Sequence, residues 1–263
     1  MKAGAAAFDL LRPPPRGLVA LIYHRVGRRT AVEVDLPVEL FAEQIAYLAQ
    51  ECHVVSLEDG LRLVESPEGA SEKPDVVVTF DDGTADFVDI AVPVLAQHGV
   101  PATLYLATSF VEHVAQFPDD GTPASWAGLR DALSTGFVDV GSHTHRHVLL
   151  DRADASVVNE ELDRSIGLIA DRLGVDAQHF AYPKAVAPSP EAEAAVRTRF
   201  RSAALAGTRP NPYGATDPYR LSRSPIQVRD GMRWFIRKAR GGMGLEDRVR
   251  SVVDRRRYRN AVR

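Results

Sequence analysis

Short apolar runs alternate along this chain with longer stretches of helical periodicity. Apolar and β-branched residues at 18–23, 75–80 and 102–106 predict buried strands. Apolar side chains recur every three or four positions over 37–51 and 159–173, which predicts two amphipathic helices. Strands that alternate with helices are typical of α/β proteins with a parallel sheet.

The alternation continues between and beyond these segments. We expect further strands at 53–55 and 179–182, and further helices at 89–98 and from 192 onward. The stretch 110–124 contains Pro and Gly and predicts a loop. Because it joins the end of one strand to the next helix, we expect this loop to overhang any site at that end of the sheet.

Two adjacent carboxylates, Asp81 and Asp82, follow the strand at 75–80 in the sequence TFDDG. Consecutive side chains on an extended segment point to opposite sides, so we expect the two to have different functions. One carboxylate would bind a cation and the other would handle a proton. An Asp-Asp-Gly sequence is also typical of a simple turn.

Three histidines follow the apolar stretch 137–141, in the sequence SHTHRH. His143 and His147 are four positions apart, the spacing that places two imidazoles on one side of a helical turn. Two imidazoles and one carboxylate leave a coordination position for water, as in catalytic zinc sites. Thiolate ligation is excluded because Cys52 is the single cysteine. The alternative is a solvated polar turn.

The two motifs, in this order and spacing, resemble those of the polysaccharide deacetylase family, carbohydrate esterase family 4, which are T-F-D-D-G and H-[ST]-x-x-H. The resemblance extends over about 18–228 and includes LIYHRVG at 21–27 and FAYPK at 180–184. It implies a distorted (β/α) barrel of about seven parallel strands. It also implies hydrolysis of N-acetyl groups, sometimes O-acetyl groups, on carbohydrates.

The resemblance implies a function for each residue of the two motifs. In the family the first Asp is the catalytic base, which corresponds to Asp81. The second Asp and the two His bind the metal, which corresponds to Asp82, His143 and His147. We expect zinc, because imidazole nitrogen is a poor ligand for magnesium, although cobalt, nickel and manganese also fit this set.

The third family motif is altered in this chain. Ala181 stands where the family has an Arg that holds the base, and Lys184-Ala185 replace a Tyr-Gly pair beside the oxyanion site. By position, Tyr182 and Lys184 become candidates for substrate and oxyanion contacts. The base needs another partner, for which we select Arg223 at the start of the expected last strand; the alternative is a surface Arg.

The usual general acid is also missing, because no histidine follows His179. The chain resembles a family branch in which the late histidine motif is permuted to the N-terminus. In a closed barrel the first strand is a neighbour of the last, so His24 at the end of 18–23 can replace the late histidine. The alternatives are a structural His24 in the barrel rim and His145 as the acid.

Trp126 follows the predicted overhanging loop. It is a candidate platform on which a sugar ring could stack. A tryptophan at such a position is more typical of a core residue at the start of a helix.

The composition is that of one enzyme domain, with 263 residues of which 45% are hydrophobic. We divide the chain into an N-terminal extension (1–17), the catalytic barrel (18–228) and a basic C-terminal helical extension (229–263). The apolar stretch near the N-terminus is short and contains Asp9, so it does not predict a secretion signal. We therefore expect a cytoplasmic protein.

The C-terminal extension differs in charge from the rest of the chain. Residues 229–263 carry 12 Lys and Arg but 4 Asp and Glu, whereas the whole chain has a net charge of −3. Interleaved with Trp234 and Phe235, these cations could contact an anionic membrane or an acidic partner in a biosynthetic complex. The alternative is a terminal helix that packs its aromatic residues on the barrel. No motif predicts nucleic-acid binding.

Together these features predict a metal-dependent deacetylase that removes N-acetyl groups from a polysaccharide, oligosaccharide or sugar conjugate in cell-surface glycan metabolism. One alternative is hydrolysis of another amide or an acetyl ester on the same scaffold. Another is an inactive sugar-binding or scaffolding protein, against which the retention of Asp81 and the three metal ligands argues.

Overall fold

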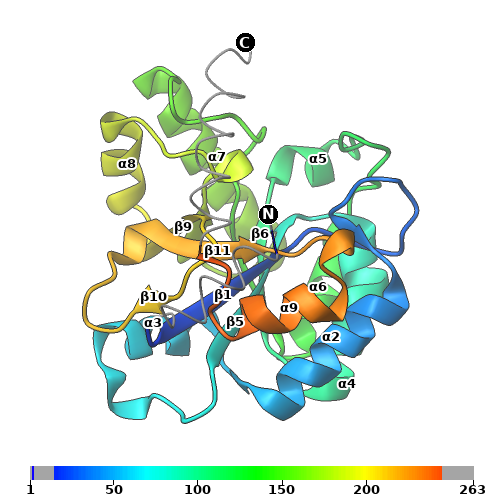
Figure 1. Ribbon diagram of the computed structural model, residues 1–263. Coiled ribbons are helices and arrows are strands. Elements are labelled where there is room, and N and C mark those ends of the chain that lie inside the picture. The colour runs from blue at the N-terminus through cyan, green and yellow to red at the C-terminus, as the bar shows by residue number, and fades with distance from the viewer. Residues whose placement is uncertain (1, 3–14, 245–263) are drawn as a thin grey trace.

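Seven parallel strands close into a barrel in the computed structural model, which describes residue 2 and residues 15–244 (Figure 1). Around the barrel the order is β1 (Gly17–Tyr23), β11 (Leu221–Pro225), β9 (Ser202–Ala206), β8 (His179–Ala181), β7 (Val138–Ser142), β6 (Ala102–Leu106) and β5 (Asp75–Asp82). Strand β5 pairs again with β1, which closes the ring. The predicted α/β barrel of about seven parallel strands is confirmed.

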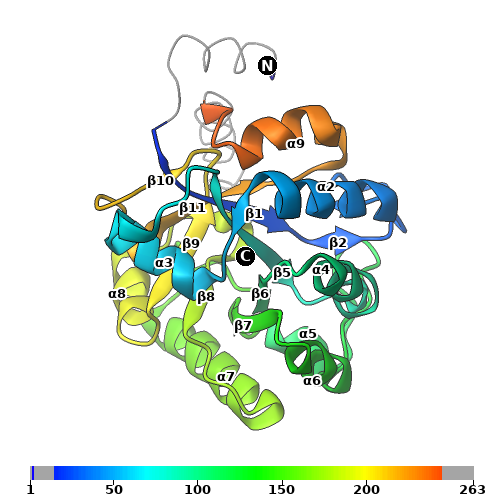
Figure 2. The ribbon, with the colours of Figure 1, turned by 90° about the horizontal axis from the view of Figure 1, so that it is seen from below.

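Helices surround the strands, as the view from below in Figure 2 shows. They are α2 (Val38–Glu51), α3 (Leu57–Glu65), α4 (Val92–His98), α5 (Thr108–Glu112), α6 (Trp126–Ser134), α7 (Ala155–Leu173), α8 (Pro190–Arg197) and α9 (Gly231–Ala239). Helix α7 illustrates why they form: Val158, Leu162 and Ile169 recur at helical spacing and are buried. It ends at Gly174, whose φ of 72° suits glycine.

Short elements complete the fold. They are β2 (Arg25–Val26), β3 (Asp35–Leu36), β4 (His53–Val54) and β10 (Asn211–Pro212), with the helical turns η1 (Pro67–Gly69), η2 (Phe87–Ala91), η3 (Pro183–Ala185), η4 (Pro218–Arg220) and η5 (Val228–Asp230). Strand β2 pairs with β3, and β10 runs antiparallel to the start of β1.

The predicted helix at 89–98 has two parts in the structure. Its first turn, Phe87–Ala91, is a wide π turn, and the regular helix α4 starts only at Val92. Pro93 lies in the first turn of α4 and has no N–H, which removes one regular helical hydrogen bond there. The predicted loop at 110–124 likewise begins inside a helix, because α5 continues to Glu112.

The barrel interior is closed at one end and open at the other. Leu57, Leu61 and Val64 of α3 pack against the interior side chains near the strand starts, in one cluster with Leu18 and Val77. A Cβ on Gly60 would lie 2.8 Å from Val77 Cγ2, so the helix approaches the strands closely. A site that admits substrate must therefore lie at the opposite end, where the strands finish.

Helix α9 lies in the described part of the predicted basic extension, residues 229–244. Its Phe235 is buried, and the Phe235 ring lies 6.0 Å from the ring of Tyr47 in α2. This favours the alternative in which the extension packs an aromatic residue on the barrel. Residues 245–263 and most of the predicted N-terminal extension 1–17 lie outside the described residues, so the domain limits stay predictions. Within residues 15–244, no helix is long and apolar enough to span a bilayer.

Candidate active site and metal centre

A cavity of about 330 Å³ opens at the carboxyl ends of the strands. Its polar lining comes from five different places in the chain, which the barrel brings together. These side chains are His24, Arg25, Asp81, Asp82, Asp119, His143, Arg146, His147 and Lys184. All four residues of the two sequence motifs therefore face one space.

Asp82, His143 and His147 form the candidate metal centre. One ligand atom from each lies within 4.8 Å of the others. His147 Nε2 is 3.5 Å and His143 Nε2 is 3.8 Å from Asp82 Oδ1. His143 Nδ1 donates to the Ala181 carbonyl at 2.7 Å, which holds the ring with Nε2 towards the other ligands. One carboxylate and two oriented imidazoles fit a divalent cation with an open position.

The strand does not place Asp81 and Asp82 on opposite sides, so that prediction is wrong. Both line the cavity because Asp82 leaves the extended conformation, with a φ of 78°. Gly83 follows with a φ of 100°, and a Cβ there would lie 2.3 Å from Leu106 Cδ1. Glycine at this position thus allows the sharp turn that brings the second carboxylate round.

The two ligand histidines do not share a helical turn, contrary to the prediction. They lie in an irregular segment after β7, where Thr144 and His147 have φ values of 67° and 61°. Their rings are nevertheless 4.9 Å apart, at an angle of 65°. The four-residue spacing was therefore informative, although a left-handed turn replaces the helix.

Burial keeps both ligand imidazoles in the neutral form that a metal requires. It lowers the pKa of His143, against the opposing effect of Asp81 and Asp82. It lowers the pKa of His147 to about 4, with the neighbouring His143 acting in the same direction. Both rings can therefore donate a lone pair at neutral pH.

Arg223 holds the candidate base Asp81 from inside the barrel. Its Nη1 donates to Asp81 Oδ1 at 2.6 Å and its Nη2 to Oδ2 at 2.9 Å. Arg223 is 1% exposed, which argues against the alternative of a surface Arg. Burial alone would raise the pKa of Asp81, but the Arg223 guanidinium outweighs it and lowers that pKa to about 2. Asp81 is therefore ionised at neutral pH.

His24 lies beside Asp81 because of barrel closure. In the β1–β5 register Tyr23 pairs with Phe80, so His24, the first residue after β1, lies next to Asp81 of β5. Strand β1 also pairs with β11, the last strand of the barrel. His24 can replace a histidine at the end of the last strand only if these two strands are neighbours. His24 Nδ1 is buried and has no hydrogen-bond partner among the described residues. The alternative of a structural histidine, hydrogen-bonded in the barrel rim, therefore has no support from this nitrogen.

Two predicted substrate contacts are corrected. Trp126 does not line the cavity: its Nε1 donates to Glu112 Oε2 at 2.9 Å and its ring packs on the core at the start of α6. Tyr182 is 1% exposed, with its ring 5.1 Å from that of Phe180 in the core outside the strands. Side chains alternate between the two faces of β8 and its continuation, which turns Tyr182 away from the cavity.

His145, the second candidate for the acid, also points elsewhere. Its Nδ1 contacts Thr108 Oγ1 at 2.9 Å, and Arg164 Nε donates to its Nε2 at 3.2 Å. Both ring nitrogens are therefore engaged outside the cavity. Lys184, in contrast, does line the cavity, as predicted from the position of the third motif.

An apolar wall of the cavity was not predicted from the sequence. Phe110 and Phe117 stack with ring centroids 4.1 Å apart, and both line the cavity together with Pro118. Arg25 secures this loop, since its guanidinium donates to the Asp119 carbonyl at 2.6 Å and to that of Pro118. The position of Arg25 directly after His24 was the available signal. The predicted loop thus does overhang the site.

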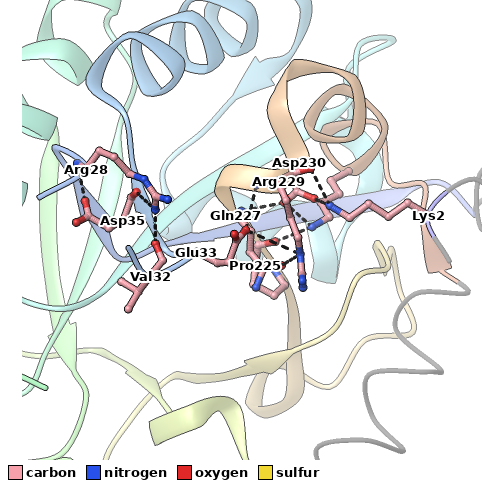
Figure 3. Close-up of polar contacts among 10 residues, drawn as sticks. Lys2, Arg28, Val32, Glu33, Asp35, Pro225, Gln227, Arg229 and Asp230 are labelled. Atoms are coloured by element: carbon pink, nitrogen blue, oxygen red, sulfur yellow. Dashed lines mark hydrogen bonds and ion pairs between the residues drawn. The ribbon is translucent and has the colours of Figure 1, made fainter. Parts of the chain in front are cut away.

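A second part of the rim, residues 27–34, is tied to the segment after β11 (Figure 3). Asp35 accepts from the backbone N–H of Arg28 at 2.8 Å, and the Glu33 carbonyl accepts from Val228 N at 2.8 Å. Val32 and Val34 of this rim line the cavity. The rim is therefore braced on both sides rather than free to move independently.

The barrel combines three metal donors that leave a coordination position open with an ionised carboxylate beside them. This arrangement is typical of hydrolases that activate water. A family model described as polysaccharide deacetylase matches residues 68–202, just over half of the chain, and the chain belongs to that family. It is accordingly a carbohydrate deacetylase, a hydrolase acting on carbon–nitrogen bonds other than peptide bonds. No curated protein matches the chain in sequence.

Solved structures share the fold. IcaB from Ammonifex degensii is 23% identical with a TM-score of 0.74, and the match covers 87% of this chain and 99% of that one. Streptococcus pyogenes deacetylase PplD, solved with acetate, is 19% identical with a TM-score of 0.74 over 86% and 99%. The putative polysaccharide deacetylase BA0330 from Bacillus anthracis is 18% identical with a TM-score of 0.68 over 84% and 68%. At these identities the similarity concerns the fold.

Proposed function

We propose that this chain hydrolyses the N-acetyl group of a carbohydrate with a divalent metal ion bound by Asp82, His143 and His147. The observation that carries the proposal is the convergence of this donor set with the Asp81–Arg223 pair and His24 on one cavity. The role in cell-surface glycan metabolism belongs to the same proposal and rests on the family alone.

Zinc is the metal we propose, because two neutral imidazoles and one carboxylate suit it better than magnesium. When bound, the ion would polarise the acetyl carbonyl and lower the pKa of a coordinated water towards about 7. Cobalt, nickel and manganese also fit these ligands. The burial that keeps His143 and His147 neutral supports ligation through Nε2, the nitrogen that each ring turns towards Asp82.

Asp81 would accept the proton of the attacking water. Its bidentate contact with Arg223 holds the carboxylate in one orientation and in the ionised form. Arg223 is itself fixed by a hydrogen bond to Thr79 Oγ1 at 3.0 Å and by the Tyr105 ring, 4.8 Å away. The base therefore loses little orientational freedom when substrate binds.

The turn Pro183–Ala185 would supply a donor to the oxyanion. Pro183 has no N–H, and the Ala185 N–H already donates to the Tyr182 carbonyl at 2.8 Å. We therefore assign this role to the Lys184 N–H, at the end of the cavity that Lys184 and Ala185 line.

His24 would protonate the departing amine. An amine is a poor leaving group unless it is protonated as the carbon–nitrogen bond breaks. His24 lies at the cavity next to Asp81, and its buried Nδ1 has no other partner in the described part of the chain. Asp81 and His24 thus divide the two proton transfers between them.

The proposal is tested by acetate release from N-acetylated monosaccharides, oligosaccharides, polymers and lipid-linked sugars. Zinc-loaded protein should release acetate and leave a free amine on the sugar, and a chelator should abolish both. Asp81→Asn is the matched control, because it removes the base and keeps the metal ligands. Acetate release that persists at the same rate in this variant, or in the presence of chelator, would contradict the mechanism.

A further inference from the structure

Lys184 presents an uncompensated cation to the cavity. It is exposed, and no carboxylate or carbonyl among residues 15–244 pairs with its ammonium group. The other lining cations are engaged: Arg146 contacts Glu161 at 2.6 Å and Glu160 at 3.4 Å, and Arg25 donates to two loop carbonyls. Lys184 is thus the lining cation with its donors available.

The backbone fixes where the Lys184 side chain starts at this cavity. Lys184 has a φ of 53° and a ψ of 12°, and Ala185 follows with a φ of 53°. Two successive non-glycine residues in the left-handed region are energetically costly, and such strain persists where the surrounding structure enforces it. Pro183 before them and the Ala185 N–H bond to the Tyr182 carbonyl enforce it here. The strained turn therefore holds Lys184 at the cavity.

The remaining charges of the cavity do not offset Lys184. Arg223 neutralises Asp81, and Asp82 belongs to the cation site of the proposed function. Asp119 is the other lining carboxylate. The positively charged Arg25 lies next to it, because its guanidinium donates to the Asp119 backbone carbonyl. With a divalent cation held by Asp82, the cavity would carry a surplus of positive charge, which favours negatively charged ligands.

We propose that the carbohydrate substrate carries an anionic group, a phosphate or a carboxylate, close to its N-acetyl group, and that Lys184 binds this anion. A neutral sugar would leave the ammonium group unpaired, whereas an anionic sugar would gain a charge-assisted hydrogen bond. This inference rests on the proposed function, since it specifies the substrate of the same site.

Equilibrium binding tests it without turnover, in the zinc-loaded full chain carrying Asp81→Asn. The probes are N-acetylglucosamine, its 1-phosphate, its 6-phosphate and N-acetylmuramic acid, so that phosphate and carboxylate are separate arms. At least one anionic sugar should bind roughly tenfold more tightly than the neutral sugar, the effect of one charged hydrogen bond. Adding salt should reduce that preference.

Three variants locate the preference. Lys184→Met should abolish it, and Lys184→Arg should keep it because the charge is retained. Lys73→Met is the matched control, since Lys73 precedes β5 at the opposite end of the barrel, and it should leave the preference unchanged. Equal binding of neutral and anionic sugars would overturn the inference. A preference for the anionic sugar that survives Lys184→Met would also overturn it, because the anion would then be bound by the metal.

Acetate release by the parent protein separates this inference from the function on which it rests. If neutral and anionic sugars are deacetylated equally well, the function holds and the anionic substrate is refuted. If no probe is deacetylated while an anion preference that depends on Lys184 persists, the anion site holds and the deacetylation of these sugars is refuted.

Discussion

Two buried ion pairs are attached to the same strand and serve different purposes. Arg223 lies within β11 and pairs with Asp81, whereas Lys238 of α9 donates to the carbonyl of Pro225, the last residue of β11, and pairs with Asp230. Both cations and both carboxylates are almost completely excluded from solvent. Burial and pairing alone would not tell them apart.

The difference lies in what each carboxylate still faces. Asp230 Oδ2 accepts from Lys238 Nζ and from Gln227 N, both at 2.8 Å, and its Oδ1 accepts from Lys2 (Figure 3). Asp81 lines the cavity, with its Oδ2 4.0 Å from His143 Nε2 beside the metal ligands. A carboxylate has about four acceptor positions, so Asp81 keeps some for substrate water. Whether the carboxylate can be reached from the cavity, rather than how deeply the ion pair is buried, distinguishes the catalytic pair from the structural one.

The largest expected effect on turnover comes from the metal ligands next to Asp81. The purified protein should contain about one divalent ion per chain, and Asp82→Ala or His147→Ala should lose most of it together with nearly all activity, because two remaining ligands cannot define the site. Elemental analysis with acetate release checks both. Full metal occupancy in these variants would refute the ligand assignment.

Asp81→Asn should have the next largest effect and separates the base from the ligands. The amide keeps the shape but cannot take a proton from water, so turnover should fall roughly 10²-fold or more while metal content is retained. Metal analysis and acetate release are measured on the same preparation. Turnover within a few-fold of the parent would show that Asp81 is not the base.

His24→Ala should reduce turnover in a way that depends on the leaving group. Loss on an amide substrate should be roughly 10²-fold, since the amine needs a proton, but only a few-fold on an activated phenyl ester. The alkaline limb of the pH–rate profile on the amide should also disappear. Equal losses on both substrates would instead indicate a structural His24.

Asp230→Asn should have the smallest effect on turnover per folded molecule, and its main effect should be on stability. Asp230→Asn removes the carboxylate that faces the buried Lys238 ammonium group, and the loss of one member of a buried pair should cost about 3–5 kcal/mol of unfolding free energy. Denaturant unfolding measures this, and the double variant with Lys238→Met should recover part of the loss. A large fall in turnover at full folding would erase the distinction between the two pairs.

The acid side of the stability curve tests the same carboxylate. Burial alone would raise the pKa of Asp230, but Lys238 and Lys2 outweigh it, so the folded-state pKa lies below the ordinary value of 3.8. The pair therefore contributes its full stability above that value and loses it as the pH falls through the folded-state pKa. Unfolding measurements below about pH 4 should show a flatter dependence in Asp230→Asn than in the parent.

Local patterns predicted most of the elements. The strand at 102–106 was predicted with its observed limits, and β5 was predicted except that it extends to Asp82. Uninterrupted β-branched runs and helical spacing depend on nearby residues, which the sequence displays directly. The π turn at Phe87–Ala91 was missed because one proline changes the hydrogen-bond pattern of an otherwise regular helical segment.

Turns and side-chain directions were less predictable. Asp82 and His147 adopt left-handed conformations that non-glycine residues rarely take, and the alternation of an ideal strand gave the wrong sides for Asp81 and Asp82. Trp126 and Tyr182 have residue types that suit sugar contacts, but each faces the core. Which face a side chain takes depends on packing against distant elements.

The sequence by itself determined the alternation of strands and helices, the two motifs and the donor types at Asp82, His143 and His147. Only the tertiary structure decided that Arg223 reaches Asp81 and that His24 lies beside Asp81. Those contacts join residues more than fifty positions apart, and they depend on the closure of β1 onto β5 and β11. Lys184 likewise has no partner at the cavity within residues 15–244, because a cation's partners are set by the elements that the fold brings near it.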